Sequence, residues 1–153
     1  MGIEIEKKFI VKNVPLELNS YKCSEIVQGY IAVEESYAEV RVRYIDNKYI
    51  LTIKSDKTNC RLEEECTLNV WQGKRLLDFC KDRVIRKTRY YIPYNGATIE
   101  LDIFKGALEG LMIAEVEFRN IDEMKNFVVP LWFGVDITDD KRYKNKNLAI
   151  YGL

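Results

Sequence analysis

The chain has 153 residues, of which 47% are hydrophobic, and its 24 Lys and Arg side chains balance its 24 Asp and Glu side chains. This composition argues against a disordered chain, provides no net charge for binding nucleic acid, and fits a single domain over residues 1–153. The absence of histidine excludes Ser-His-Asp and Cys-His catalysis and argues against a zinc site.

The sequence features that would direct a chain to a membrane or to export are not predicted here. Met1 leads directly into a charged segment, and no stretch approaches the roughly 20 apolar residues of a membrane helix. The four cysteines form no CxxC pair and are expected to be reduced. We therefore expect a cytoplasmic protein without a membrane or nucleic-acid partner. Its oligomeric state is left open.

In chain order, alternating apolar and polar residues predict strands within 1–10, 26–33, 38–45, 49–55, 60–68, 84–94, 97–104 and 111–119. Hairpin turns are expected at Asp46-Asn47 and Asn95-Gly96. Helices are expected from Asn69 to about Asp82, over 122–128, and after Thr138 or Asp139. The elements predict an α+β fold, mostly antiparallel, whose eight strands close into a barrel with a few flanking helices.

Charged residues recur at alternate positions of five of these strands. Because alternate side chains of a strand share a face, Glu4, Glu6 and Lys8 lie on one face of the first strand and Ile5 and Phe9 on the other. The same spacing returns at Arg41 and Arg43, at Arg61, Glu63 and Glu65, at Lys87 and Arg89, and at Glu115 and Glu117, while Lys54 and Asp102 stand singly.

The charged faces suggest a wet interior. In an open sheet they would face water, whereas a closed barrel would place them in its lumen. Burying unpaired charge costs several kcal/mol per ion, so such a lumen must hold water, ions or a charged ligand. Basic and acidic residues segregate by strand, which favours a phosphate-rich anion beside the Arg and Lys residues and Mg²⁺ or Mn²⁺ beside the carboxylates. Plain internal ion pairing is the alternative.

The order of these motifs resembles the CYTH superfamily, the triphosphate tunnel metalloenzymes. Glu4-Ile5-Glu6-Lys7-Lys8 is similar to the family's N-terminal ExExK signature. It is followed by RxR at 41–43, Lys54 at the end of the next strand, ExE at 63–65, KxR at 87–89, Asp102, ExE at 115–117, and the segments 136–138 and 141–143. The resemblance covers nearly the whole chain and implies an eight-stranded antiparallel barrel that forms a tunnel.

The resemblance also implies roles for the charged residues. Triphosphate would be bound by Lys8, Arg41, Arg43, Lys54, Lys87 and Arg89. Divalent metal, Mg²⁺ or Mn²⁺, would be held by Glu4, Glu6, Glu115 and Glu117, with Glu63, Glu65 and Asp102 as further ligands or supporting residues. Tyr30 and Lys54 look like the Tyr-Lys pair of short bacterial members that hydrolyse inorganic triphosphate. With Arg43 they are the expected catalytic residues, and packing is the alternative for Tyr30.

The expected function is metal-dependent hydrolysis of the terminal phosphoanhydride of a small-molecule triphosphate, with inorganic tripolyphosphate as the favoured substrate. A non-catalytic binder of polyphosphate or nucleoside triphosphate would use the same basic residues and stays open, as does a thiamine triphosphatase. A class IV adenylyl cyclase is the less favoured alternative, because these enzymes usually carry a His-Phe pair and this chain has no histidine. The basic clusters 74–75 and 141–146 are interpreted as solvated helix faces.

Overall fold

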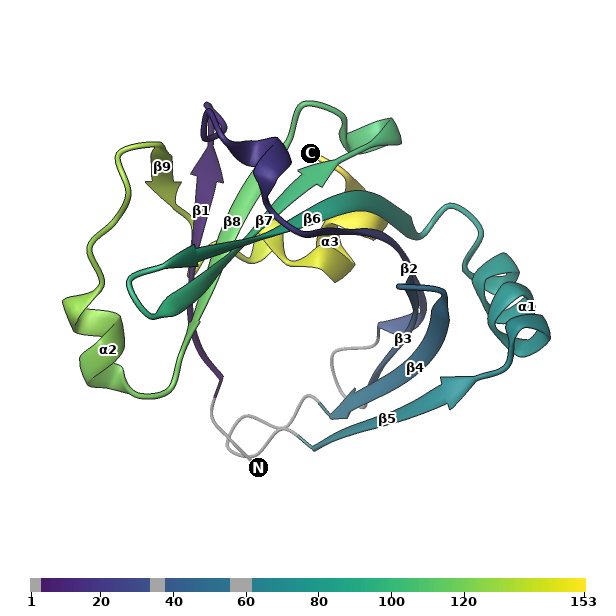
Figure 1. Ribbon diagram of the computed structural model, residues 1–153. Coiled ribbons are helices and arrows are strands. Elements are labelled where there is room, and N and C mark those ends of the chain that lie inside the picture. Colours follow the sequence, from purple (N-terminus) through teal and green to yellow (C-terminus); the bar gives the residue numbers. More distant parts are fainter. Residues whose placement is uncertain (1–3, 34–37, 56–61) are drawn as a thin grey trace. The chain divides into compact units, whose positions relative to one another are not determined.

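The computed structural model describes residues 4–33, 38–55 and 62–153 (Figure 1). Its strands are β1 (Ile5–Val11), β2 (Cys23–Val33), β3 (Ala38–Ile45), β4 (Lys48–Ser55), β5 (Glu63–Leu68), β6 (Val84–Tyr94), β7 (Ala97–Phe104), β8 (Met112–Phe118) and β9 (Phe133–Asp136). Its helices are α1 (Val70–Cys80), α2 (Ile121–Asn126) and α3 (Asn145–Tyr151). The strand pairs β1–β8, β2–β3, β3–β4, β4–β5, β6–β7 and β7–β8 are antiparallel, so the predicted α+β, mostly antiparallel class is confirmed.

The described chain falls into two compact units. The first contains residues 25–86 and 142–153, and the second contains residues 4–24 and 87–141. Hydrogen bonds order the strands β5-β4-β3-β2 in the first unit and β6-β7-β8-β1-β9 in the second. Among the described residues no ladder joins β5 to β9, so hydrogen bonding does not establish the closed barrel. The single domain over 1–153 stays a prediction.

In the first unit, α1 packs on β3 and β4. As predicted, Asn69 begins the helix: its side chain accepts a hydrogen bond from the Gln72 N–H at 2.8 Å, and the Gln72 side chain accepts one from the Asn69 N–H at 3.2 Å. This reciprocal capping satisfies two amide groups that the first turn of a helix leaves unpaired. The helix approaches the sheet closely, because Gly73 is buried directly against the ring of Tyr49.

Gly73→Ala is expected to lower the free energy of unfolding by about 1–3 kcal/mol, because a Cβ at this position would overlap the Tyr49 ring. Urea unfolding of the variant and of the wild-type chain measures the change. Lys74→Ala, at the exposed neighbouring position, is the control. Alanine favours a helix over glycine by about 1 kcal/mol, so a more stable Gly73→Ala protein would contradict the close packing.

The second unit buries the apolar faces of its strands. Its core contains Val11, Ile92, Ile99, Leu101, Ala114, Val116 and Phe118, and α2 packs on β1 and β8. The β6–β7 hairpin turns at Asn95 and Gly96, both with positive φ (46° and 79°), as the Asn-Gly pair predicts. The predicted hairpin at Asp46 and Asn47, in the first unit, is confirmed in the same way, with φ of 48° and 62°.

The structure differs from the predicted elements in two places near the C-terminus. β9 was not predicted: it has only four residues, includes Gly134, and pairs with β1 through an irregular register. The last helix begins at Asn145, later than predicted, because Thr138 does not cap it. The Thr138 hydroxyl instead contacts Asp136 at 2.5 Å and accepts the Lys8 N–H at 3.1 Å. Of the predicted strand 60–68, Cys60 and Arg61 lie outside the described residues.

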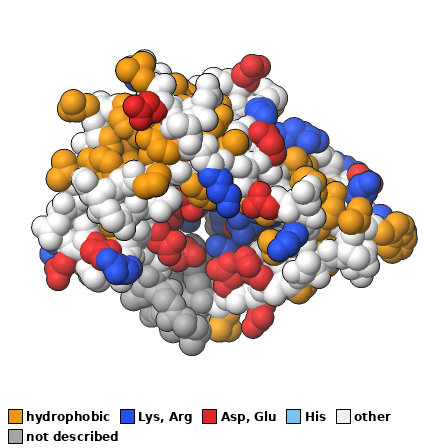
Figure 2. Space-filling model, in the orientation of Figure 1, with side chains coloured by type: hydrophobic (Ala, Val, Ile, Leu, Met, Phe, Trp, Pro, Cys, Tyr) orange, Lys and Arg blue, Asp and Glu red, His pale blue; other side chains and the backbone are white. Residues whose placement is uncertain are grey.

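Apolar side chains are exposed on part of the second unit. Figure 2 shows them gathered over the region of β1 and β9. The segment 128–135, which runs into β9, contains the exposed residues Val128, Leu131 and Val135. No described helix combines the length and the apolar character needed to cross a membrane. The cytoplasmic location stays a prediction.

Candidate functional site

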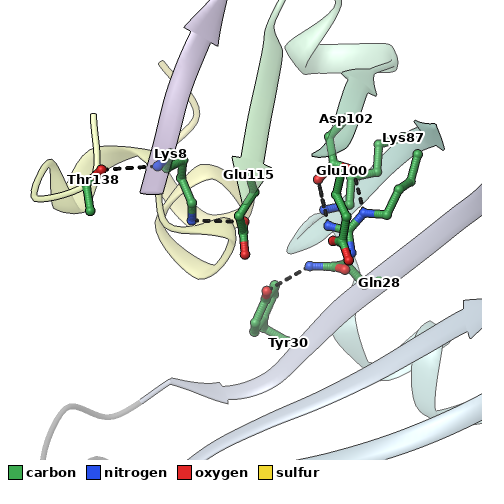
Figure 3. A network of polar contacts seen from close by, with 9 residues as sticks. Lys8, Gln28, Tyr30, Lys87, Glu100, Asp102, Glu115 and Thr138 are labelled. Atoms are coloured by element: carbon green, nitrogen blue, oxygen red, sulfur yellow. Dashed lines mark hydrogen bonds and ion pairs between the residues drawn. The ribbon is translucent and has the colours of Figure 1, made fainter. Parts of the chain in front are cut away.

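In the second unit, the register of β1 and β8 aligns the predicted charged pairs. Glu6 lies opposite Glu117, and Lys8 lies opposite Glu115. The Lys8 ammonium is 3.4 Å from Glu115 Oε2 (Figure 3). Phe9 is buried, as expected for the alternate face of the strand. Val11 is buried as well, whereas Ile5 is only half-buried, so the predicted alternation is confirmed for the second half of the strand.

Glu6 and Glu115 form a coupled carboxylate pair. Burial raises the pKa of Glu6 to about 8, aided by its hydrogen bond to Glu115 and by repulsion from that carboxylate. Burial alone would also raise the pKa of Glu115, but the hydrogen bond from Glu6 and the charges of Lys8 and Arg89 lower it. Near neutral pH the two carboxylates therefore share one proton. A bound cation could take the place of that proton.

The donor chemistry around this pair fits a hard divalent cation. Carboxylate oxygens suit Mg²⁺ or Mn²⁺, and neither histidine nor thiolate is predicted as a ligand. Glu4 and Glu117, the other two predicted ligands of the second unit, are exposed. Among the described residues, no three Asp, Glu, His or Cys side chains come together closely enough to hold a metal ion. The predicted carboxylates thus come from the paired strands β1 and β8 and the residue just before β1, and their described side chains do not form a complete coordination shell.

Asp102, on β7, binds two buried basic side chains, those of Lys87 and Arg89. Its carboxylate accepts from Lys87 Nζ at 2.6 Å and from Arg89 Nε and Nη2 at 2.7 and 2.9 Å. Burial opposes ionisation, but the charges and hydrogen bonds of Lys87 and Arg89 lower the pKa of Asp102 to about 2. Arg89 also pairs with Glu100 at 2.5 Å, and Figure 3 shows these groups together. Three donors therefore engage the Asp102 oxygens.

The first unit contains a second charged face. Its registers align Tyr30, Arg41, Thr52 and Glu65 in one row across four strands. Arg41 Nη2 donates to Thr52 Oγ1 at 3.4 Å, and that hydroxyl donates to Glu65 Oε1 at 3.2 Å. The buried Nε of Arg41 has no hydrogen-bond partner among the described residues. A buried donor of this kind indicates an acceptor that the described part of the chain does not supply.

A buried glutamine lies beside this row. Arg43 Nε donates to Gln28 Oε1 at 3.1 Å, and Gln28 Nε2 donates to Tyr30 Oη at 2.9 Å. Burial raises the pKa of Tyr30 to about 12. Lys54, the predicted partner of Tyr30, is 3.6 Å from Glu63 Oε2. The structure thus gives Tyr30 a hydrogen bond to Gln28 and Lys54 an ion pair with Glu63.

Four residues of these faces were absent from the predicted site: Gln28, Thr52, Glu100, and Glu39, which lies opposite Lys54 in the register of β3 and β4. Glu39 lies two residues before Arg41, and Glu100 lies two residues before Asp102. Both continue the spacing of charged residues at alternate positions, so extending that pattern by two residues would have included them. Gln28 and Thr52 are uncharged, and a pattern of charges alone could not have found them.

Comparison with known proteins places the chain among triphosphatases. The inorganic triphosphatase of Nitrosomonas europaea is 40% identical over 150 residues, which cover 96% of this chain and 97% of that protein. The inorganic triphosphatase of Acetivibrio thermocellus is 41% identical over 155 residues, covering 97% and 94%. A crystal structure of an inorganic triphosphatase matches 97% of this chain and 95% of its own, with 38% identity and a TM-score of 0.79.

A more distant structure shares the fold. A Hippeastrum protein described as having a dominant triphosphatase activity matches 80% of this chain and 83% of its own, with a TM-score of 0.56 at 18% identity. No family model matches the chain.

Proposed function

Because the chain belongs to the inorganic triphosphatase family of CYTH-type triphosphate tunnel metalloenzymes, we propose that it hydrolyses the terminal phosphoanhydride bond of inorganic tripolyphosphate. The observation that carries the proposal is the buried Arg41 guanidinium, whose Nε lacks an acceptor among the described residues. Phosphate oxygens would supply that acceptor, and a guanidinium suits them in charge and in geometry.

Six cations would bind the triphosphate: Arg41, Arg43 and Lys54 from the first unit, and Lys8, Lys87 and Arg89 from the second. Each group projects from a strand of a hydrogen-bonded sheet, so the direction of its side chain is set by the backbone. Little charge rearrangement is then needed as negative charge shifts among the phosphate oxygens in the transition state. We propose that these faces enclose the substrate in the closed eight-stranded barrel that the sequence predicts.

The carboxylates Glu4, Glu6, Glu115 and Glu117 would hold the divalent metal, Mg²⁺ or Mn²⁺. When bound, the cation would neutralise phosphate charge and make an attacking water more acidic. The chain's own contribution would be the Glu6–Glu115 pair, which holds a shared proton in the metal-free protein and would give it up to bind a cation.

We propose that Asp102 positions the side chains of Lys87 and Arg89 and does not bind the metal, because both side chains already engage its oxygens. Glu63 and Glu65 would likewise support Lys54 and Thr52, their partners in the first unit. Tyr30 and Lys54, with Arg43, remain the proposed catalytic residues.

The test is phosphate release from tripolyphosphate with Mg²⁺ or Mn²⁺. Turnover is expected with either cation, and EDTA is expected to abolish it. Thiamine triphosphate and ATP, assayed in parallel, are expected to be poorer substrates. Lys74→Ala on the exposed side of α1 is the control and should retain wild-type rates. Tight binding of tripolyphosphate without turnover would instead identify a non-catalytic binding protein.

A further inference from the structure

The side-chain amide of Gln28 is fully buried and bridges two proposed catalytic residues. Gln28 is 0% exposed and touches Arg43 through its oxygen and Tyr30 through its nitrogen. An arginine Nε can only donate, so the amide oxygen must face Arg43. The NH₂ group is thereby turned toward Tyr30, as Figure 3 shows. The direction of both hydrogen bonds is set by the guanidinium.

This arrangement decides how Tyr30 can act. Its hydroxyl oxygen is occupied as an acceptor from Gln28, so its own hydrogen must point elsewhere. The bond from Gln28 leaves this hydrogen available for an acceptor other than Gln28. Because burial raises the pKa of Tyr30 to about 12, the hydrogen stays on the oxygen at neutral pH. Tyr30 is therefore equipped to donate a hydrogen bond and is unsuited to act as a base.

The acceptor for this hydrogen would lie close to that of Arg41. The strand register places Tyr30 directly opposite Arg41, and Gln28 directly opposite Arg43. The Arg41 Nε has no acceptor among the described residues, and the Tyr30 hydroxyl, an acceptor from Gln28, presents its hydrogen on the same face beside it. One anionic oxygen, or two from the same phosphate, would satisfy both donors.

We propose that Gln28 is a positioning residue for triphosphate hydrolysis, which holds the Tyr30 hydroxyl as a donor to a phosphate oxygen and fixes the orientation of the Arg43 guanidinium. The inference rests on the proposed function. It gives the two halves of one amide separate effects: the NH₂ group acts through Tyr30 on the rate of turnover, and the oxygen acts through Arg43 on substrate affinity. No proton is transferred in this role.

Gln28→Met tests both effects, because it keeps the length of the side chain and removes both hydrogen bonds. We expect kcat to fall about tenfold and KM to rise about tenfold, the size expected for the loss of one hydrogen bond in each case. In the Tyr30→Phe background, adding Gln28→Met should lower kcat by a clearly smaller factor and still raise KM. A residue that only supports packing would lower kcat by the same factor in both backgrounds.

Two further variants complete the test. Gln28→Glu replaces Gln28→Met if the latter does not fold, and Ile26→Val measures the effect of lost stability alone. Gln28→Glu keeps an acceptor for Arg43 and cannot donate to Tyr30, so kcat should fall about tenfold in the wild-type background and stay unchanged in the Tyr30→Phe background. Ile26→Val, on the same face of β2 and buried, should lower thermal stability without changing kcat or KM.

The outcomes separate the two proposals. Wild-type kcat in Gln28→Glu, or equal losses of kcat with and without Tyr30→Phe, would overturn the role of Gln28 and leave the triphosphatase activity standing. Failure of the wild-type chain to hydrolyse tripolyphosphate would overturn the proposed function itself.

Discussion

Glu6→Gln is expected to remove most triphosphatase activity and, at the same time, to stabilise the metal-free protein at alkaline pH. The activity should fall on the order of 100-fold or more, because the carboxylate proposed to hold the metal becomes a neutral amide. The gain in stability follows from the raised pKa of Glu6, about 8 compared with an ordinary 4.5. A residue whose charge the fold disfavours would thus be retained for its function.

The pH dependence has a defined sign. Between about pH 4.5 and pH 8, folded Glu6 binds a proton that the unfolded chain has lost, so the wild-type chain loses stability as the pH rises through this window. The glutamine variant has no such titration. The difference in melting temperature in favour of Glu6→Gln should therefore grow from pH 5 to pH 8 and level off above it.

Thermal melts in EDTA from pH 5 to pH 9 measure this difference. Glu109→Gln, at an exposed position of the same unit, is the matched control and should show no comparable trend. Parallel melting curves for Glu6→Gln and wild type would show that Glu6 does not share its proton with Glu115. Equal rates of tripolyphosphate hydrolysis would remove Glu6 from the metal site.

The alternation of charges predicted which strand faces are polar, but not which side chains meet. Glu6 and Lys8 lie on the predicted face of β1 because side-chain direction depends only on neighbours in sequence. The contact between Lys8 and Glu115 depends on the register of two strands that are far apart in the chain. Sequence spacing carries no information on that register.

The same limit explains how Asp102 was interpreted. From the sequence it was one of three carboxylates interpreted as further metal ligands or supporting residues. Only the register of β6 and β7, which places Asp102 opposite Arg89, shows that its oxygens engage two cations. Gln28 was overlooked for a different reason. Its proposed role depends on the direction of two hydrogen bonds, and a search for patterns of charged residues does not include an uncharged side chain.

Asp102→Asn is expected to destabilise the protein by about 3–5 kcal/mol at pH 7, because it leaves the buried Lys87 and Arg89 without their shared counterion. The loss should shrink in acid. The pKa of Asp102 is about 2 when folded, compared with an ordinary 3.8, so its contribution is present above about pH 4 and is lost as the pH falls toward 2. Urea unfolding from pH 3 to pH 7 measures the difference, with the exposed Asp139→Asn as control.

Replacing the whole cluster separates its role in function from its role in folding. A chain carrying Lys87→Met, Arg89→Met and Asp102→Leu together should recover most of the stability that Asp102→Asn loses, because apolar side chains of similar volume can replace a buried ionic cluster at little cost. It should not recover activity, since two of the six proposed phosphate-binding cations are gone. Persistent instability of the triple variant would show that the ionic cluster is required for folding, and restored hydrolysis would show that Lys87 and Arg89 do not bind the substrate.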